Sequence, residues 1–141
     1  MNFPILSSIT LLPFLGAAFI FIFNNKNNEY KNVIYISLFI SVVTFFLAIF
    51  LWYVFDKSTP AFQFVEEKNW ISGYIKFKFG VDGISILFIV LTALITPICI
   101  ISCINSVKIR LKEFLIAILV LESFMIGVFC SLDLVVFYLF F

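Results

Sequence analysis

The chain has 141 residues, of which 64% are hydrophobic and 12% charged, with 21 Phe, no His and a formal net charge of +1. This composition excludes an ordinary water-soluble globular domain and gives no electrostatic basis for binding nucleic acid. The three cysteines, Cys99, Cys103 and Cys130, fall in apolar stretches, so neither a disulfide framework nor a zinc site is indicated. The sequence therefore predicts a membrane protein.

Four apolar segments are long enough to cross a bilayer, which requires about 20 apolar residues. They cover about residues 3–23, 33–55, 84–106 and 114–129. The first contains Pro13, which transmembrane helices tolerate, and its apolar stretch is too long for a signal peptide. The second is rich in Leu, Ile, Phe and Val, and its insertion is favoured by roughly 7 kcal/mol. We therefore expect an all-α transmembrane fold with four full membrane-spanning helices.

A fifth apolar segment, LDLVVFYLFF, begins near Leu132 and reaches Phe141, about half of the length that a crossing needs. We expect either that it lies in the membrane interface or that the chain is a piece of something longer. An interfacial helix has a strongly polar face, whereas only Asp133 and Tyr138 are polar here. The segment is therefore expected to be the truncated start of a fifth helix.

The connection before the third segment contains YIKFKFGVDG, in which Ile75, Phe77 and Phe79 alternate with Lys76 and Lys78. Period-two alternation is typical of a half-buried strand. A short strand or hairpin on the outer membrane face is expected, although an irregular loop is the alternative. No repeat or linker divides the chain, so residues 1–141 form one unit.

The first and third connections carry an excess of basic residues. They contribute Lys26, Lys31, Lys108, Arg110 and Lys112. By the positive-inside rule these two connections are cytoplasmic, which places the N-terminus and the strand-like loop on the outer, periplasmic side.

The third segment carries a stripe of small, weakly polar residues. Placed at 100° per residue, its members fall within a wedge of about 80°. They are Ser85, Thr92, Thr96, Cys99, Cys103 and Ser106. Small residues on one face allow close approach of another helix, so the stripe predicts a helix–helix contact face. Cys99 and Cys103 lack a third soft ligand, so packing is favoured over metal binding.

Three acidic residues occupy special positions. Asp82 and Asp133 stand at the starts of the third and fifth helices, where capping is worth about 1 kcal/mol each. Glu122 lies near the centre of the fourth helix, where an ionisable group costs about 3 kcal/mol. Its carboxyl must be neutral or paired with a group from another helix. A residue of a proton or ion path and a protonated Glu that bridges helices are both open interpretations.

The stretches FGVDGISILFIVLTALITPICIIS and LVLESFMIGVFCSLDLVVFYLFF resemble the subunit M family of NADH-quinone oxidoreductase (respiratory complex I), called chain 4 in mitochondria. The upstream stretch FVEEKNWI is also similar to that family. The VDG element (Val81, Asp82 and Gly83) is shared with subunit L and with membrane subunits of cation/proton antiporters, whereas the FCSLDLVVFYLFF ending favours subunit M.

The resemblance implies a proton-translocating role, driven by electron transfer from NADH to quinone in other subunits. It identifies residues 1–141 as the N-terminal transmembrane part of an antiporter-like subunit. The proton-handling glutamate of the fifth helix would then follow Phe141 immediately. By this resemblance the chain has no catalytic residues and no cofactor of its own, because flavin and iron–sulfur clusters belong to other subunits.

The resemblance implies other complex I membrane subunits and the lipid bilayer as partners, in a bacterial or mitochondrial inner membrane. Glu122 is the candidate proton-pathway residue of this piece. Two alternatives stay open: a membrane subunit of a multisubunit cation/proton antiporter, and a small non-enzymatic membrane scaffold protein.

Overall fold

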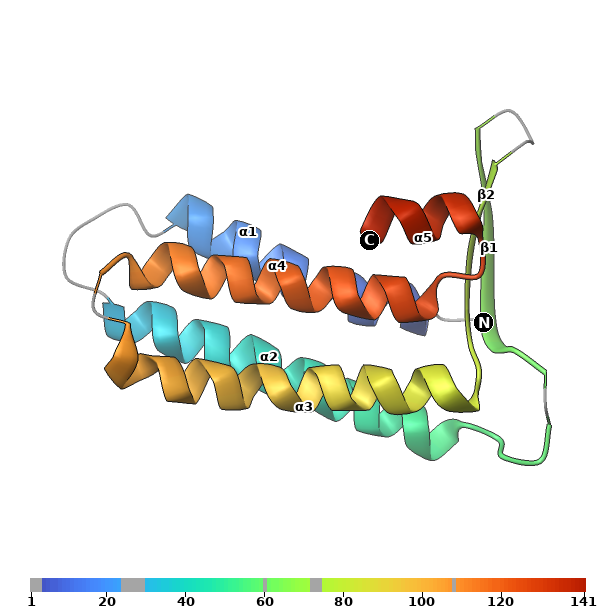
Figure 1. The fold of residues 1–141 in the computed structure, drawn as a ribbon, viewed down its shortest axis with the longest axis horizontal. Coiled ribbons are helices and arrows are strands. Elements are labelled where there is room, and N and C mark those ends of the chain that lie inside the picture. The colour runs from blue at the N-terminus through green and yellow to red at the C-terminus, as the bar shows by residue number, and fades with distance from the viewer. Residues whose placement is uncertain (1–3, 24–29, 60, 72–74, 108) are drawn as a thin grey trace.

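The computed structural model describes residues 4–23, 30–59, 61–71, 75–107 and 109–141 (Figure 1). Its elements are, in chain order, α1 (Ile5–Phe23), α2 (Tyr30–Val54), β1 (Gln63–Ile71), β2 (Ile75–Val81), α3 (Gly83–Ser106), α4 (Leu111–Cys130) and α5 (Leu134–Phe140). The first four helices are long and apolar enough to cross a membrane. The predicted fold class, four spanning helices with a short fifth helix and a strand-like loop, is confirmed.

The four long helices lie side by side along the long axis of the molecule, with α1 next to α4 and α2 next to α3 (Figure 1). A Cβ atom at Gly16 on α1 would collide with the Ile40 side chain on α2, so this glycine permits the close approach of these two helices. Many large apolar side chains stay exposed on the outside of the bundle, including Leu15, Phe21 and Phe39. An apolar exterior of this kind suits the interior of a membrane.

The buried apolar residues form two clusters. One lies nearer the strands and includes Leu6, Ile9, Ala48, Leu51, Phe79, Val81, Ile86, Ile89, Ala93 and Ile126. The other includes Ala17, Ile20, Val33, Ile100, Leu111, Leu115 and Leu119. We call the end of the bundle near the strands the hairpin end. The opposite end, where α2 and α4 begin, is the connection end. The helices are thus fixed to one another along most of their length.

At the hairpin end, β1 and β2 pair as an antiparallel hairpin that stands across the ends of the helices (Figure 1). The strand predicted from the alternating pattern is therefore present, and Phe79 is fully buried. The Leu132 N–H donates to the carbonyl of Lys78 over 3.0 Å, so the hairpin also binds the turn between α4 and α5. The hairpin joins parts of the chain that are far apart in sequence.

The fifth helix turns back along α4 rather than lying flat and apart from the bundle (Figure 1). A Cβ at Gly127 on α4 would come within 2.6 Å of the Phe140 ring, so only glycine fits beneath this aromatic side chain. Phe140 also lies 5.9 Å from Phe79 and 6.2 Å from Phe124, between ring centroids. The short α5 is held by aromatic packing against α4 and β2.

Candidate functional site

Glu122 occupies the middle of α4, about 16 Å from the first residue of the helix and about 12 Å from the last. Its side chain is 1% exposed. The buried face of α4 on which it lies also carries Leu115, Leu119 and Ile126. The helical spacing of this apolar stripe is what turns the acid toward the interior of the bundle.

The Glu122 carboxyl has no hydrogen-bond partner among the described residues, because both oxygens are buried and neither accepts a bond. Basic residues of the spans lie at their ends, with Lys31 opening α2 and Lys112 near the start of α4. Lys112 is ten residues before Glu122 on the same helix, which is about 15 Å. A carboxylate without a counter-charge at this depth costs several kcal/mol, so the neutral acid is the favoured form.

Buried hydroxyl groups lie on α3 and α4 in the bundle interior. Ser123 donates from its Oγ to the carbonyl of Thr10 on α1. On α3, Thr96 is buried and lies on the side of the helix that faces α4. Thr96 itself donates to the Thr92 carbonyl over 3.0 Å. Each of these two hydroxyls is thus satisfied by a backbone carbonyl, whereas the Glu122 carboxyl is not.

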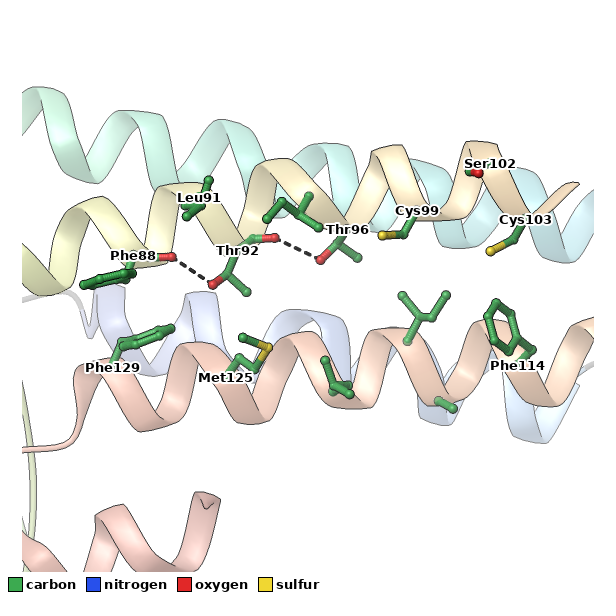
Figure 2. A pocket seen from close by; sticks show the side chains of 14 residues that line it. Phe88, Leu91, Thr92, Thr96, Cys99, Ser102, Cys103, Phe114, Met125 and Phe129 are labelled. Carbon is green, nitrogen blue, oxygen red and sulfur yellow. Dashed lines mark hydrogen bonds between the residues drawn. The ribbon is translucent and has the colours of Figure 1, made fainter. Parts of the chain in front are cut away.

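A groove of about 720 Å³ runs between α3 and α4 (Figure 2). Thr92 and Thr96 lie on its α3 wall, as does Cys99 further along the helix, while Met125 and Phe129 line the α4 side. The Phe88 and Phe129 rings stack at its hairpin end, with centroids 5.2 Å apart. The lining is almost wholly apolar apart from hydroxyl and thiol groups.

The groove shows where the small-residue stripe of α3 lies. Thr92 and Thr96 are buried, whereas Cys99 is exposed, Cys103 is half-buried and Ser85 is half-buried near the start of the helix. The second half of the predicted contact face therefore looks into the groove, and it does not pack closely against another described helix. No third His, Cys, Asp or Glu joins Cys99 and Cys103 within the described part of the chain.

Asp82 and Asp133 both occupy N-cap positions. Asp82 Oδ1 accepts from the Ser85 N–H over 2.6 Å at the start of α3, and Asp133 Oδ1 accepts from the Val135 N–H over 2.8 Å at the start of α5. The hydrogen bonds with Ser85 hold the pKa of Asp82 below its ordinary value. These contacts are those of helix caps.

Glu66 on β1 was not singled out by the sequence. Its carboxylate accepts from the Leu6 N–H over 2.8 Å and the Ser7 N–H over 3.3 Å, and from the Ser7 hydroxyl. Glu66 therefore caps the start of α1 from a strand that lies some 60 residues further along the chain. A sequence motif could not have predicted this cap, because capping motifs involve residues within about four positions of a helix start.

No family model matches the chain. Curated relatives do match it over nearly its whole length. It is 44% identical over 137 residues to NADH-ubiquinone oxidoreductase chain 4 of Marchantia polymorpha, covering 96% of this chain and 27% of the relative. It is 42% identical over 145 residues to NADH-quinone oxidoreductase subunit M of Rickettsia conorii, covering 100% and 29%. Subunit M of Rhodobacter capsulatus is 46% identical over 139 residues, covering 97% and 27%.

The chain thus spans less than a third of the length of the relatives it matches. Four spanning helices together with these relatives make it a multi-pass protein of the inner membrane. Over all of its residues, the chain is a homologue of part of NADH-quinone oxidoreductase subunit M, the family whose mitochondrial members are named NADH-ubiquinone oxidoreductase chain 4.

Proposed function

We propose that these 141 residues form part of a membrane subunit of NADH-quinone oxidoreductase that takes part in proton translocation coupled to electron transfer from NADH to quinone. The observation that carries this proposal is Glu122, a carboxyl buried at the centre of a spanning helix with both oxygens unpaired among the described residues. Ionisable groups at such depths are costly, and by default they indicate ion or proton paths.

Glu122 would act as a proton-binding group and not as a chemical catalyst. In its neutral form the carboxyl carries a proton inside the apolar bundle. It releases that proton when an acceptor, such as a water chain or another acid, comes within hydrogen-bond distance. The buried apolar side chains of Leu115, Leu119 and Ile126 on the same face of α4 limit the access of water to the acid. The redox chemistry would take place elsewhere, so this chain would contribute helices and one proton site.

The proposal extends to partners and cofactors. The partners would be the other membrane subunits of complex I and the remainder of a subunit of the relatives' length. Flavin and iron–sulfur clusters would be bound by other subunits. Residues 1–141 would be the N-terminal transmembrane part of that subunit.

The orientation is also a proposal. Lys31, Arg110 and Lys112 all lie at the connection end, opposite the hairpin (Figure 1). Lys26 and Lys108, which the positive-inside argument also used, are outside the described residues. The hairpin end also carries Lys57 and Lys78, but acidic residues accompany them, and Glu67 pairs with Lys78. The excess of basic residues at the connection end supports a cytoplasmic location for that end, with the N-terminus and the hairpin on the periplasmic side.

The test uses the complete enzyme in sealed membrane vesicles, with Glu122→Gln introduced into the full-length subunit. NADH oxidation and acidification of the vesicle lumen are recorded on the same preparation. We expect fewer protons to be moved for each NADH oxidised in the variant, because glutamine fills the same space and binds no proton. Glu113→Gln is the matched control, since Glu113 lies on the same helix but is exposed beside Arg110.

An unchanged ratio of protons to NADH in Glu122→Gln, in an enzyme that assembles normally, would overturn the proton-path role. The antiporter interpretation predicts a different result, namely cation-driven proton exchange without NADH. The scaffold interpretation predicts that loss of assembly is the only effect.

A further inference from the structure

A second pocket, away from Glu122, lies at the hairpin end of the bundle. It has a volume of about 430 Å³ and lies where α2 ends and α3 begins (Figure 1). A Cβ atom at Gly83, the first residue of α3, would meet nothing within 4 Å, so the pocket is open on that side. Its other lining residues include Trp52, Phe55, Lys57, Thr59, Ile86 and Leu87.

The position of Trp52 sets the depth of this pocket in a membrane. Trp52 and Tyr53 lie in the last turn of α2, a helix long and apolar enough to span a bilayer. Both side chains are exposed on the outside of the bundle. Trp and Tyr are enriched where a spanning helix leaves the hydrocarbon, with their rings at the level of the lipid headgroups. The pocket beside Trp52 is therefore within reach of a phospholipid headgroup.

Lys57 gives the wall of this pocket a positive charge. Its Nζ lies 5.6 Å from the centroid of the Trp52 ring, within the range of a cation–π contact. None of the described acidic residues forms an ion pair with it. The nearby carboxylates have other partners, because Asp56 accepts from the N–H and the hydroxyl of Ser58, and Asp82 caps α3. Among the described residues, no acid lines the pocket.

The loop that carries Lys57 is fixed by the side chain of Gln63, the first residue of β1. Gln63 Oε1 accepts from the Asp56 N–H over 2.9 Å, and Nε2 donates to the Asp56 carbonyl over 2.5 Å and to Thr59 Oγ1 over 3.1 Å. Thr59 is an acceptor in this bond, and its own hydroxyl proton has no acceptor among the described residues. The loop thus presents a cation and a hydroxyl donor at one pocket.

The rest of the lining is apolar, which favours a lipid over a free anion. Phe55 and Ile86 form part of the wall, and the exposed Leu87 side chain continues the apolar surface along α3. An inorganic anion would leave this surface without a partner, whereas a phospholipid has a phosphate and two acyl chains. A zwitterionic headgroup would bring an ammonium group near Lys57, so an anionic phospholipid matches the charge better.

We propose that this pocket binds the headgroup of an anionic phospholipid. Lys57 pairs with the phosphodiester, Thr59 donates a hydrogen bond to a phosphate oxygen, and the first part of an acyl chain lies against Leu87. Such a lipid connects the end of α2 to the start of α3 at the membrane surface. This inference does not depend on the proposed function, because it involves neither Glu122 nor proton movement.

The test uses the two tryptophans of the chain, Trp52 and Trp70. Trp70→Phe leaves Trp52 as the single indole, beside the pocket. This chain, purified in micelles of an uncharged detergent, is titrated with phosphatidylglycerol brominated on its acyl chains, because bromine quenches the fluorescence of a nearby indole. We expect quenching that saturates, with half-saturation at a lower lipid concentration than for brominated phosphatidylethanolamine. Inorganic phosphate is expected not to reverse it.

Variants made in the same background test the role of the charge. Lys57→Gln is expected to raise the lipid concentration at half-saturation about fivefold, the factor that one Lys near anionic lipid contributes. Lys57→Arg keeps the charge and is expected to leave it unchanged. Lys78→Gln is the matched control, since Lys78 lies at the same end but pairs with Glu67 and does not line the pocket. Each curve is divided by one recorded with the unbrominated lipid, because removing Lys57 alters Trp52 emission directly.

Equal half-saturation concentrations in Lys57→Gln and the parent chain would overturn the proposal, as would equal shifts in Lys57→Gln and Lys78→Gln. Equal affinity for the two lipids, or reversal of quenching by inorganic phosphate, would refute an anionic phospholipid as the occupant. Gly83→Leu places a side chain in the open part of the pocket without changing the charge. We expect it to weaken quenching as well, and unaltered quenching in this variant would place the lipid outside the pocket. Lys57 is exposed, so its replacement leaves the fold intact.

Discussion

Glu66 offers the most direct measurement of how the hairpin stabilises the bundle. Its carboxylate accepts two backbone N–H groups at the start of α1 and the hydroxyl of Ser7. Losing an N-cap costs about 1 kcal/mol, the negative charge at the helix start adds about 0.3–1 kcal/mol, and the Ser7 bond adds about 1 kcal/mol. We therefore expect Glu66→Ala to lower the free energy of unfolding by about 2–3 kcal/mol.

The assay is unfolding of the purified chain in mixed micelles by increasing the fraction of a denaturing detergent, followed by helical circular dichroism. Hydrogen exchange at the amides of Leu6 and Ser7 gives a local reading, and we expect both to lose protection in Glu66→Ala. Glu67→Gln is the matched control, because Glu67 is the next residue on β1 and its ion pair with Lys78 is exposed. Equal stability of the two variants, with protected amides in both, would refute the capping account.

Three further predictions concern α3, α4 and α5. Gly127→Ala brings a Cβ to within 2.6 Å of the Phe140 ring, so we expect a loss of about 1–3 kcal/mol from overpacking and faster proteolysis of α5. The hydrogen bonds with Ser85 lower the pKa of Asp82. Its contribution to stability is therefore present above the pKa of the unfolded state and is lost as the pH falls through the lower pKa of the folded state. The free energy of unfolding measured between pH 6 and 2 should show this loss, and Asp82→Asn should abolish this pH dependence. Arg110 has φ 56° in the left-handed region, so Arg110→Gly should be about 1 kcal/mol more stable than Arg110→Ala in the same unfolding assay.

Much of this fold could be predicted because lipid imposes simple rules on a sequence. Long apolar runs predict spanning helices, and the positions of Asp82 and Asp133 fit the starts of α3 and α5 as found. Alternation in YIKFKFGVDG predicted β2, since a half-buried strand needs a period of two. The burial of Glu122 followed from the apolar residues that share its helical face.

What sequence could not supply were contacts between distant segments. Glu66 lies on a strand whose charges suggest only a solvated loop, and its partner amides belong to α1. The spacing of the small residues on α3 showed that they share one face of the helix. It could not show whether that face packs against another helix or lines an open groove. The groove beside Thr96 depends on the relative rotation of α3 and α4, which the sequence of one helix does not give.

The way in which the buried hydroxyls are satisfied has a consequence for how the chain enters the membrane during synthesis. Ser37 and Thr44 donate to carbonyls of their own helix, as does Thr92, so α2 and α3 need no neighbour to satisfy these groups. In α4 the Ser123 hydroxyl instead requires the Thr10 carbonyl of α1. Because the ribosome makes α1 first, the acceptor is already in the bilayer when α4 leaves the translocon. In a rearranged gene in which α4 precedes α1, α4 would enter the bilayer before the Thr10 carbonyl has been made. We expect α4 to integrate more slowly in that case.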